Sequence, residues 1–318
     1  MVGSFSGSLT RSTEDDNSPQ YSDRESLTIT GVDSDFSRYL SSHHNAILIG
    51  VDGGWYDVTS FRHRHPGGAA LLEKSHGRDV TEIVTSFHEG NVLKGWRPVG
   101  FYSRPIEVMK DPAAKAFRDL HKEFSDKGYF KTSMEWHNEM THNRFIDQLC
   151  GIVFGSFFTG ISSSWWRDEH FEHHAFTNVA DDEGNSWDVQ MQEDLWAQIY
   201  EGVLHVQLLL SHYGKPWTLE KDLMVTTDWY RAQILSNLDI KTPIWMDWFH
   251  GGLNFHQVHH LYPRMPRHRF REATKRVREV CEDVGLKLDE CSFTEALWRT
   301  LTHLKKMGRQ YSDSIKSY

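Results

Sequence analysis

His65-Pro66-Gly67-Gly68 breaks a helical pattern in the first third of the chain, and Phe87-His88-Glu89-Gly90 ends the pattern that follows. Proline and paired glycines favour a tight turn in which the backbone can approach a bound group closely. This turn would aim the His65 side chain at that group. His88 stands at the end of a second predicted helix, so we expect it to complete the same site from the opposite side.

The segments around these two histidines predict a small α+β unit. Ala46 to Val51 is a short apolar strand, Asp52-Gly53-Gly54 is typical of a hairpin turn, and Trp55 to Val58 is the expected partner strand. Two short helices are predicted to follow, over Ala69–Ser75 and Asp79–Phe87.

From Leu27 to Tyr102 the chain resembles the cytochrome b5 family, on the His-Pro-Gly-Gly turn, the later histidine and the strand-turn-strand before them. The resemblance implies a haem domain over residues 27–102, with His65 and His88 as axial ligands of haem b. Two axial imidazoles leave no open iron position, so such a haem carries electrons. The residues expected in the pocket wall are Leu71, Leu72, Ile83, Val84 and Phe87. The competing interpretation of His65 is a surface histidine beside a turn, and His43, His63 and His76 are expected to be exposed to solvent.

Length and composition limit the number of domains and the possible partners of the chain. Its 318 residues suffice for two domains, and the polar first 25 residues predict a disordered tail without a signal peptide. A formal charge of −9 argues against nucleic acid as a partner. Three separated cysteines suggest neither disulfides nor a thiolate site, which fits a reducing, cytosol-facing location.

Residues 111–318 read as a mainly helical second domain. An amphipathic helix is predicted from Asp111 to Tyr129, and a last one from about Arg269 to Val284, ending at Gly285. The basic stretch Arg264 to Arg278 either faces anionic lipid headgroups or is the solvated face of that helix.

Two clusters of the form H-x-x-H-H distinguish this second domain, which belongs to a chain with 20 histidines. They are His170-Phe171-Glu172-His173-His174 and His256-Gln257-Val258-His259-His260. Positions i, i+3 and i+4 share a helix face, so we expect each cluster to present three imidazoles towards one point and the two to hold two metal ions between them. An all-imidazole set favours a catalytic iron pair over structural zinc. The alternative is solvated or packing histidines.

With their flanks, these clusters resemble the membrane front-end desaturases, a family of acyl and sphingolipid desaturases that carry a fused cytochrome b5 domain. The flanks are Trp165-Trp166-Arg167, Thr177-Asn178, Gly251-Gly252-Leu253 and Leu261-Tyr262-Pro263, and the resemblance spans about Phe117 to Leu286. It implies a cytochrome b5-like haem domain followed by a mainly α-helical histidine-box domain.

The resemblance also implies the chemistry and partners of a lipid desaturase. Electrons would pass from a cytochrome b5 reductase through the haem to two non-haem irons, which use O2 to desaturate an acyl or ceramide lipid. The implied location is the cytosolic face of the endoplasmic reticulum membrane. The ligands carried over are His170, His173, His174, His256, His259 and His260, with His137 from a first box and His212 as a weaker candidate. His205 and His250 are expected to be packing residues.

The chain departs from the family pattern in three places. His256 stands where the family commonly has glutamine, and it can still bind metal. In the first box, His137 matches the second histidine, but Ser133 stands where the first is expected, unless His142 replaces that ligand. The spanning hairpins before the first box and between the second and third are expected to be missing. The best remaining apolar stretches are Phe145–Ile161 and Leu195–Tyr213, and polar or charged residues interrupt both.

Two other functions remain open. The chain could be a haem electron carrier with an inactive desaturase remnant, located in the cytosol or peripherally on a membrane. It could also be a hydroxylase, because oxygen rebound and removal of a second hydrogen use the same ligands. The resemblance around His205–His212 and His256–Arg267 slightly favours a sphingolipid substrate.

Overall fold

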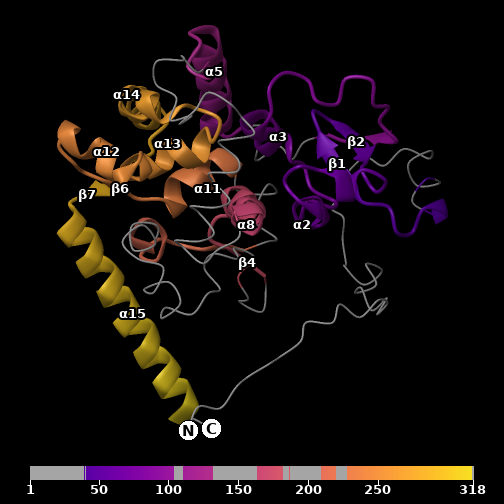
Figure 1. Ribbon diagram of the computed structural model, residues 1–318. Helices are drawn as coiled ribbons and strands as arrows, with labels where there is room; N and C mark the ends of the chain where they lie inside the picture. The colour runs from indigo at the N-terminus through magenta and orange to yellow at the C-terminus, as the bar shows by residue number, and fades with distance from the viewer. Residues whose placement is uncertain are drawn as a thin grey trace, which may run out of the picture.

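The computed structural model describes residues 39, 41–103, 110–131, 163–181, 186, 209–219 and 228–316. Within these ranges the strands of the N-terminal part lie on one side of the molecule, and the larger helical part lies on the other (Figure 1). The predicted tail, residues 1–25, falls outside the described residues.

A three-stranded antiparallel sheet forms the centre of the N-terminal part. It consists of β1 (Leu48–Val51), β2 (Gly54–Asp57) and β3 (Gly100–Phe101), in the order β1-β2-β3. The predicted hairpin is confirmed, because Asp52 and Gly53 turn with positive φ angles of 49° and 81°. β1 starts two residues later than expected, since the Ile47 N–H donates to the Thr59 hydroxyl at 2.8 Å and not to a neighbouring strand.

Two short helices, α2 (Ala69–Lys74) and α3 (Thr81–Phe87), flank this sheet after the 3-10 turn η2 (Arg62–Arg64). α3 begins later than the predicted Asp79 because the Asp79 carboxylate accepts hydrogen bonds from the N–H and hydroxyl of Thr81, at 3.1 and 2.5 Å. Asp79 therefore precedes the helix and holds its first turn.

The helical part is built on α5 (Pro112–Asp126), α8 (Ser163–Ala175), α11 (Trp229–Ser236), α13 (His256–Leu261) and α14 (Phe270–Asp283). Shorter elements connect them: β4 (Val179–Ala180), β5 (Thr218–Leu219), β6 (Asp239–Ile240), η6 (Ile244–Met246), α12 (Asp247–His250), η7 (Leu253–Phe255), η8 (Arg267–Arg269) and β7 (Glu290–Cys291). Asp111 caps α5 by accepting the Ala113 N–H at 2.9 Å, and Gly128, with φ +71°, follows its end. Both predicted helix ends near Tyr129 and Val284 fall within three residues of those observed.

One hydrophobic core runs through both parts of the molecule. It contains Ile49 and Leu72 from the sheet region together with Phe117 of α5, Tyr230 of α11 and Val277 of α14. The fully buried Tyr262 packs edge-to-face on Phe124, at 5.3 Å between ring centres, just beyond the end of α13. The second histidine-rich helix is therefore fixed against the centre of the core.

The expectation that the helix ending near Val284 is the last one is wrong. A further helix, α15 (Phe293–Lys316), follows β7 and runs away from the other elements (Figure 1). Phe293, Leu297 and Leu301 recur at a four-residue spacing, which is the signal that could have revealed it. Among the described helices, none is both long enough and apolar enough to cross a bilayer.

Several arginines of the basic stretch Arg264 to Arg278 form ion pairs with acidic residues of other elements. Arg271 forms a two-pronged ion pair with Asp247, at 2.6 and 2.7 Å. Arg276 pairs with Glu123 of α5 at 3.2 Å, and Arg278 with Glu290 of β7 at 2.9 Å. Because these guanidinium groups bind carboxylates of other elements, they tie α14 to its neighbours. A lipid-facing role of the stretch stays a prediction, and Arg267 and Lys275 are exposed, as the solvated-face interpretation expects.

Candidate haem and metal centres

His65 and His88 face each other across a space that fits a six-coordinate haem iron. Their ring centres lie 6.2 Å apart. Two imidazoles bound on opposite sides of one metal, each with a metal–nitrogen bond of about 2.1 Å, would have ring centres roughly 6.3 Å apart. The pair is thus spaced for an iron ion between them.

Hydrogen bonds orient both rings towards that space. His65 Nδ1 lies 3.2 Å from the Gly68 carbonyl oxygen, and His88 Nδ1 lies 3.1 Å from that of Val84. A carbonyl only accepts, so each Nδ1 carries the proton and each Nε2 keeps its lone pair for a metal. Burial lowers the pKa of both rings, which also favours the neutral, metal-binding form.

The surroundings of the pair follow the sequence-based expectation except at His76. Leu71, Leu72 and Ile83 are buried, and His43 and His63 are exposed. His76 was expected to be exposed, but it is half-buried because its Nδ1 accepts the Leu48 N–H at 2.9 Å. It therefore secures the start of β1.

Four buried histidines form a first cluster in the helical part. His173 of α8, His212, and His256 and His260 of α13 each offer a ring nitrogen, and these atoms all lie within 4.8 Å of one another. His256 Nε2 is 2.8 Å from His212 Nε2 and 3.1 Å from His260 Nε2. His212, the weaker candidate, thus belongs to this four-histidine cluster.

Three further histidines form a second cluster. His174 Nε2 lies 3.0 Å from His170 Nε2 and 3.1 Å from His259 Nε2. His174 is buried, whereas His170 and His259 are half-buried. This three-histidine cluster is therefore the more accessible of the two.

The expectation that each H-x-x-H-H segment aims three imidazoles at one point is wrong. His170 and His174 share one cluster and His173 enters the other, while His256 and His260 stay together and His259 crosses over. At about 100° per residue, positions i and i+4 lie about 40° apart around a helix, whereas i+3 and i+4 lie about 100° apart. Each cluster consequently takes an i, i+4 pair from one helix and a single histidine from the other.

Burial favours the neutral form of five of the clustered imidazoles. Desolvation, followed by the neighbouring imidazoles, lowers the pKa of His174, His212, His256 and His260 well below the usual range. Desolvation, together with the charge of Arg267, lowers the pKa of His259 to about 3. Neutral imidazoles are the form that binds metal.

Hydrogen bonds fix the tautomer of two of these ligands. His212 Nδ1 donates to the Ser236 carbonyl at 3.2 Å, and His260 Nδ1 donates to Gln233 Oε1 at 3.1 Å. The amide of Gln233 is itself oriented, since its Nε2 donates to the His174 carbonyl at 3.2 Å. The Nε2 atoms of both rings therefore present lone pairs to the cluster interior.

The converging nitrogens fit metal ions better than they fit one another. His256 Nε2 lies 2.8 and 3.1 Å from two other Nε2 atoms, and His174 Nε2 lies 3.0 and 3.1 Å from two more. A neutral imidazole can donate one Nε2 proton to only one such neighbour, so the remaining lone pairs repel unless a cation lies between them. Two nitrogens bound to one ion at about 2.1 Å and at right angles lie about 3.0 Å apart. The donor set and the spacing both suit a pair of transition-metal ions.

Supporting residues in this centre escaped the sequence analysis. Gln233 links His260 to the backbone of α8, and the Thr177 hydroxyl donates to the His173 carbonyl at 2.6 Å while accepting from His260 Nδ1 at 3.0 Å. Gln233 lies in a short, mainly buried helix whose spacing carries no metal-binding signal. In the sequence, Thr177 belongs only to the flank that follows the first H-x-x-H-H segment.

Contacts join the His65/His88 pair to the histidine clusters. The Phe87 ring, adjacent to His88 in the chain, packs edge-on against His174 at 6.3 Å between ring centres. Lys74 of α2 pairs with Glu172, inside the first H-x-x-H-H segment, at 2.6 Å. Arg264 donates to the His88 carbonyl at 2.8 Å. The two centres are thus held against each other.

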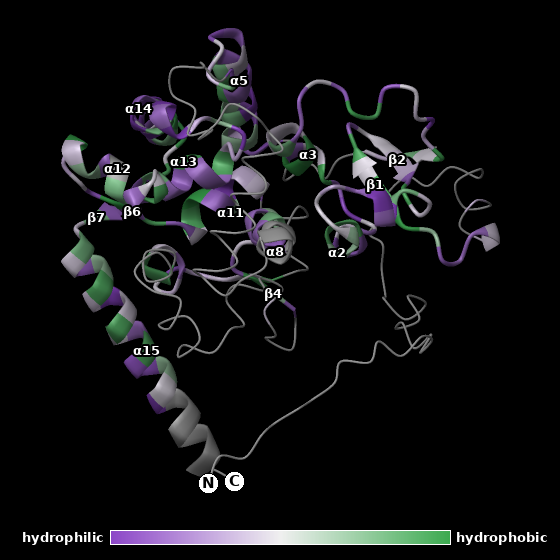
Figure 2. Cartoon of the chain, viewed as in Figure 1, coloured by the Kyte–Doolittle hydropathy of each residue, from purple (hydrophilic) through white to green (hydrophobic). Residues whose placement is uncertain are grey.

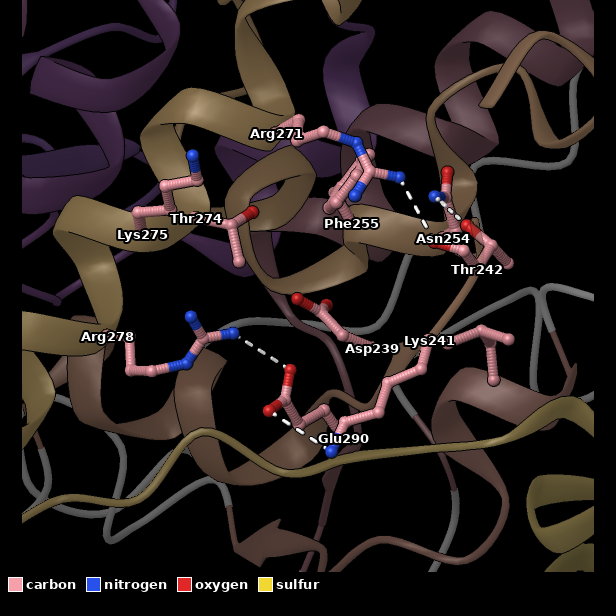
Figure 3. A pocket seen from close by; sticks show the side chains of 11 residues that line it. Asp239, Lys241, Thr242, Asn254, Phe255, Arg271, Thr274, Lys275, Arg278 and Glu290 are labelled. Atoms are coloured by element: carbon pink, nitrogen blue, oxygen red, sulfur yellow. Dashed lines mark hydrogen bonds and ion pairs between the residues drawn. The ribbon is translucent and has the colours of Figure 1, made fainter. Parts of the chain in front are cut away.

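A separate cavity of about 170 Å³ lies on the other side of α13, between β6, β7 and α14 (Figure 3). Asp239 points into it, and its Oδ1 accepts the Gln257 N–H at 2.8 Å. Arg278 and Lys241 pair with Glu290 at its edge. None of the predicted ligands lines this cavity, so it lies apart from the metal centre.

Several positions named in the sequence analysis lie outside the described residues. They are His137, Ser133, His142, His205, the apolar stretch Phe145–Ile161 and most of Leu195–Tyr213. His250 is buried and belongs to neither cluster.

Two family models match separate parts of the chain. A model described as cytochrome b5-like haem/steroid binding domain matches residues 34–140, and one described as fatty acid desaturase matches residues 195–292. No solved structure matches.

Curated relatives carry desaturase names. A Delta 8-(E)-sphingolipid desaturase of Kluyveromyces lactis is 37% identical over 108 residues, which is 34% of this chain but only 18% of the relative. A Delta(8)-fatty-acid desaturase of Helianthus annuus is 22% identical over 428 residues, covering 87% of this chain and 92% of the relative. An acyl-lipid (9-3)-desaturase of Physcomitrium patens is 23% identical over 390 residues, covering 80% and 74%. The second alignment is longer than this chain, so that relative contains segments without a counterpart here.

Proposed function

We propose that this chain, which joins a cytochrome b5-like domain to a fatty acid desaturase domain in the order of the front-end desaturases, is an oxygen-dependent lipid desaturase. The observation that carries the proposal is the convergence of seven histidines on two adjacent clusters next to a facing histidine pair. The facing pair suits an electron-carrying haem, and the two clusters suit two metal ions.

The haem would be held by His65 and His88. Backbone carbonyls hold the Nδ1 protons of both rings, which leaves both Nε2 lone pairs for a metal, and the two ring centres lie 6.2 Å apart. A Cβ on Gly67 would lie only 3.0 Å from His65 Cε1, so this glycine leaves room for the ligand ring. With both axial positions filled by protein, the group would supply single electrons and bind no O2.

Two iron ions would be held by the four-histidine and three-histidine clusters, with His137 as a further ligand from the first box. When bound, the ions would supply oxygen activation and removal of two hydrogens from an acyl chain. The protein's own part is to keep the imidazoles neutral and aimed. Gln233 and the Ser236 carbonyl do this by holding the Nδ1 protons of His260 and His212.

Electron delivery would occur within the chain. An ion pair joins α2 to α8 through Lys74 and Glu172, and Arg264 binds the backbone at the end of α3 through the His88 carbonyl. The Phe87 ring lies against His174. A cytochrome b5 reductase would then be needed only to reduce the haem.

The names of the relatives support the choice of substrate class. Their names give sphingolipids and fatty acyl lipids, and we propose a long-chain acyl or ceramide lipid of the endoplasmic reticulum membrane, presented at the cytosolic face with O2 as co-substrate.

The test is the metal and haem content of the purified chain, followed by lipid product analysis. About three irons per haem, together with a reducible haem spectrum and an unsaturated product, would support the desaturase. About one iron per haem would leave an electron carrier with an inactive remnant. A hydroxylated product from an iron-loaded chain would instead identify a hydroxylase.

A further inference from the structure

α15 begins on the body of the protein and soon leaves it. Ala296 and Thr300 are buried, at 0% and 6% exposed, and Ala296 packs with Leu210, Ile240 and Cys291. Beyond this anchor the helix projects outwards (Figure 1). Its 24 residues make it about 36 Å long, so most of its length lies beyond the buried anchor.

The projecting helix carries an exposed apolar face. Leu297, Trp298 and Leu301 are 38%, 67% and 56% exposed. Their spacing puts them within an arc of about 100° on the helix surface. Figure 2 shows apolar residues recurring along α15. Exposed apolar residues scattered singly are ordinary, but a contiguous face of this kind marks a contact with a partner or a membrane.

A second group of exposed apolar residues lies at the same edge of the molecule. Ile244, Trp245 and Phe249, in η6 and α12, are 72%, 68% and 50% exposed. β6 and β7 are parallel, with Ile240 beside Cys291, so the chain leaves both strands at the same end. η6 follows one strand within a few residues and α15 follows the other, so both apolar groups lie near that end of the strands.

Charge favours an anionic lipid surface as the occupant of this face. Residues 300–309 contain Lys305, Lys306 and Arg309 and neither Asp nor Glu, although the whole chain has a formal charge of −9. Lys305 lies four residues after Leu301, on the same side of the helix. A second copy of the chain would bring like charges together, whereas an anionic leaflet attracts such residues. The arginines of α14, by contrast, already bind carboxylates.

We propose that α15, with Ile244, Trp245 and Phe249 beside it, is an interfacial helix that docks this protein on an anionic lipid bilayer. Trp298 and Leu301 would enter the boundary between headgroups and acyl chains, and Lys305, Lys306 and Arg309 would contact lipid phosphates or carboxylates. Docking of this kind needs neither haem nor iron, so it extends beyond the proposed desaturation.

Vesicle co-sedimentation of the full chain tests the proposal. We expect the protein to bind vesicles made of equal parts phosphatidylcholine and phosphatidylserine, and to bind vesicles of phosphatidylcholine alone at least about tenfold more weakly. The double substitution Trp298→Ser and Leu301→Ser should weaken binding to the mixed vesicles about tenfold or more. Phe101→Ser, a matched change at another exposed aromatic, should leave binding unchanged.

A charge-matched pair of variants separates electrostatic attraction at α15 from net charge. Lys305→Glu with Lys306→Glu should weaken binding about tenfold or more, whereas Lys115→Glu with Lys122→Glu, on exposed positions of α5, should have little effect. Circular dichroism and gel filtration check folding. Wild-type protein that binds neither vesicle would overturn the proposal. So would a dimer that Trp298→Ser and Leu301→Ser dissolve, because the face would then join two copies.

Discussion

His65 and His88 can be separated experimentally from the clustered histidines. We expect His65→Ala or His88→Ala to abolish the reducible haem spectrum, because each removes one of two facing ligands. His173→Ala or His259→Ala should leave that spectrum intact and remove non-haem iron. The measurement is a reduced-minus-oxidised absorption spectrum with elemental iron analysis. An unchanged haem spectrum in His65→Ala would show that the axial assignment is wrong.

Gln233 allows a test of how the candidate ligand His260 is oriented, because its side chain contacts His260 Nδ1 and would not contact a bound metal ion. Gln233→Leu removes one of the two acceptors, with Thr177, that hold the His260 Nδ1 proton, and we expect metal affinity to fall about tenfold or more. Gln233→Glu keeps an oxygen acceptor and should retain most of the affinity. Competitive titration with a metal-binding dye checks both. Equal losses in the two variants would mean that Gln233 acts through packing alone.

The candidate ligands were predictable to different degrees. The tight turn and the helix after it indicate His65 and His88. The H-x-x-H-H spacing indicates six of the seven clustered histidines. His212 lies far from the others in sequence, and only the fold of α11 and α13 brings it to them. Gln233 and Thr177 could not be predicted, because a hydrogen bond between distant helices leaves no local pattern.

At the scale of elements, Asp228 makes the start of α11 sensitive to pH. It caps the helix by accepting the N–H groups of Tyr230 and Arg231, and burial raises its pKa to about 7. The folded protein thus keeps a proton that the unfolded chain loses near pH 4, and this contribution to stability declines as the pH rises from about 4 to about 7.

Asp228→Asn keeps the accepting oxygen and removes the ionisation. We expect the stability advantage of the variant over wild type to grow by about 3 kcal/mol between pH 5 and pH 8, because about two pKa units separate pH 5 from the pKa of the folded protein. Urea unfolding at both pH values checks this. A difference that does not change with pH would show that Asp228 does not titrate in this range.

Element boundaries followed the sequence wherever local chemistry sets them. The Asp52-Gly53 turn and the end of α14 before Gly285 lie where the pattern put them. The expected direction of the histidines around each helix was wrong, because imidazoles on the same helix face need not point at the same site. A difference of about 100° between i+3 and i+4 is enough to send neighbours to different clusters.

At the scale of the whole molecule, the Lys74–Glu172 pair tests how firmly the two parts are joined. Glu172 is only 7% exposed, so Lys74→Ala should leave a nearly buried carboxylate without its partner and cost about 1–3 kcal/mol. Lys115→Ala breaks an exposed pair within α5 and should cost less than about 0.5 kcal/mol. Chemical unfolding followed by haem absorbance checks both. Equal effects would indicate that the parts are held by apolar packing alone.

The order of the two domains was predictable from motifs, but their contact was not. Each motif is local, whereas Arg264 reaches the His88 carbonyl from a position 176 residues further along the chain. The shared core, from Ile49 to Val277, likewise depends on packing that no periodicity encodes.

The exchange of ligands between α8 and α13 has a consequence for assembly. Each helix donates to both clusters, so a metal ion bound at either one fixes the relative rotation of the two helices that the other requires. The first ion would bear the entropic cost of this ordering and the second would not, so occupancy should rise cooperatively. Partially metallated protein would then be scarce, and one lost histidine would lower the occupancy of both positions.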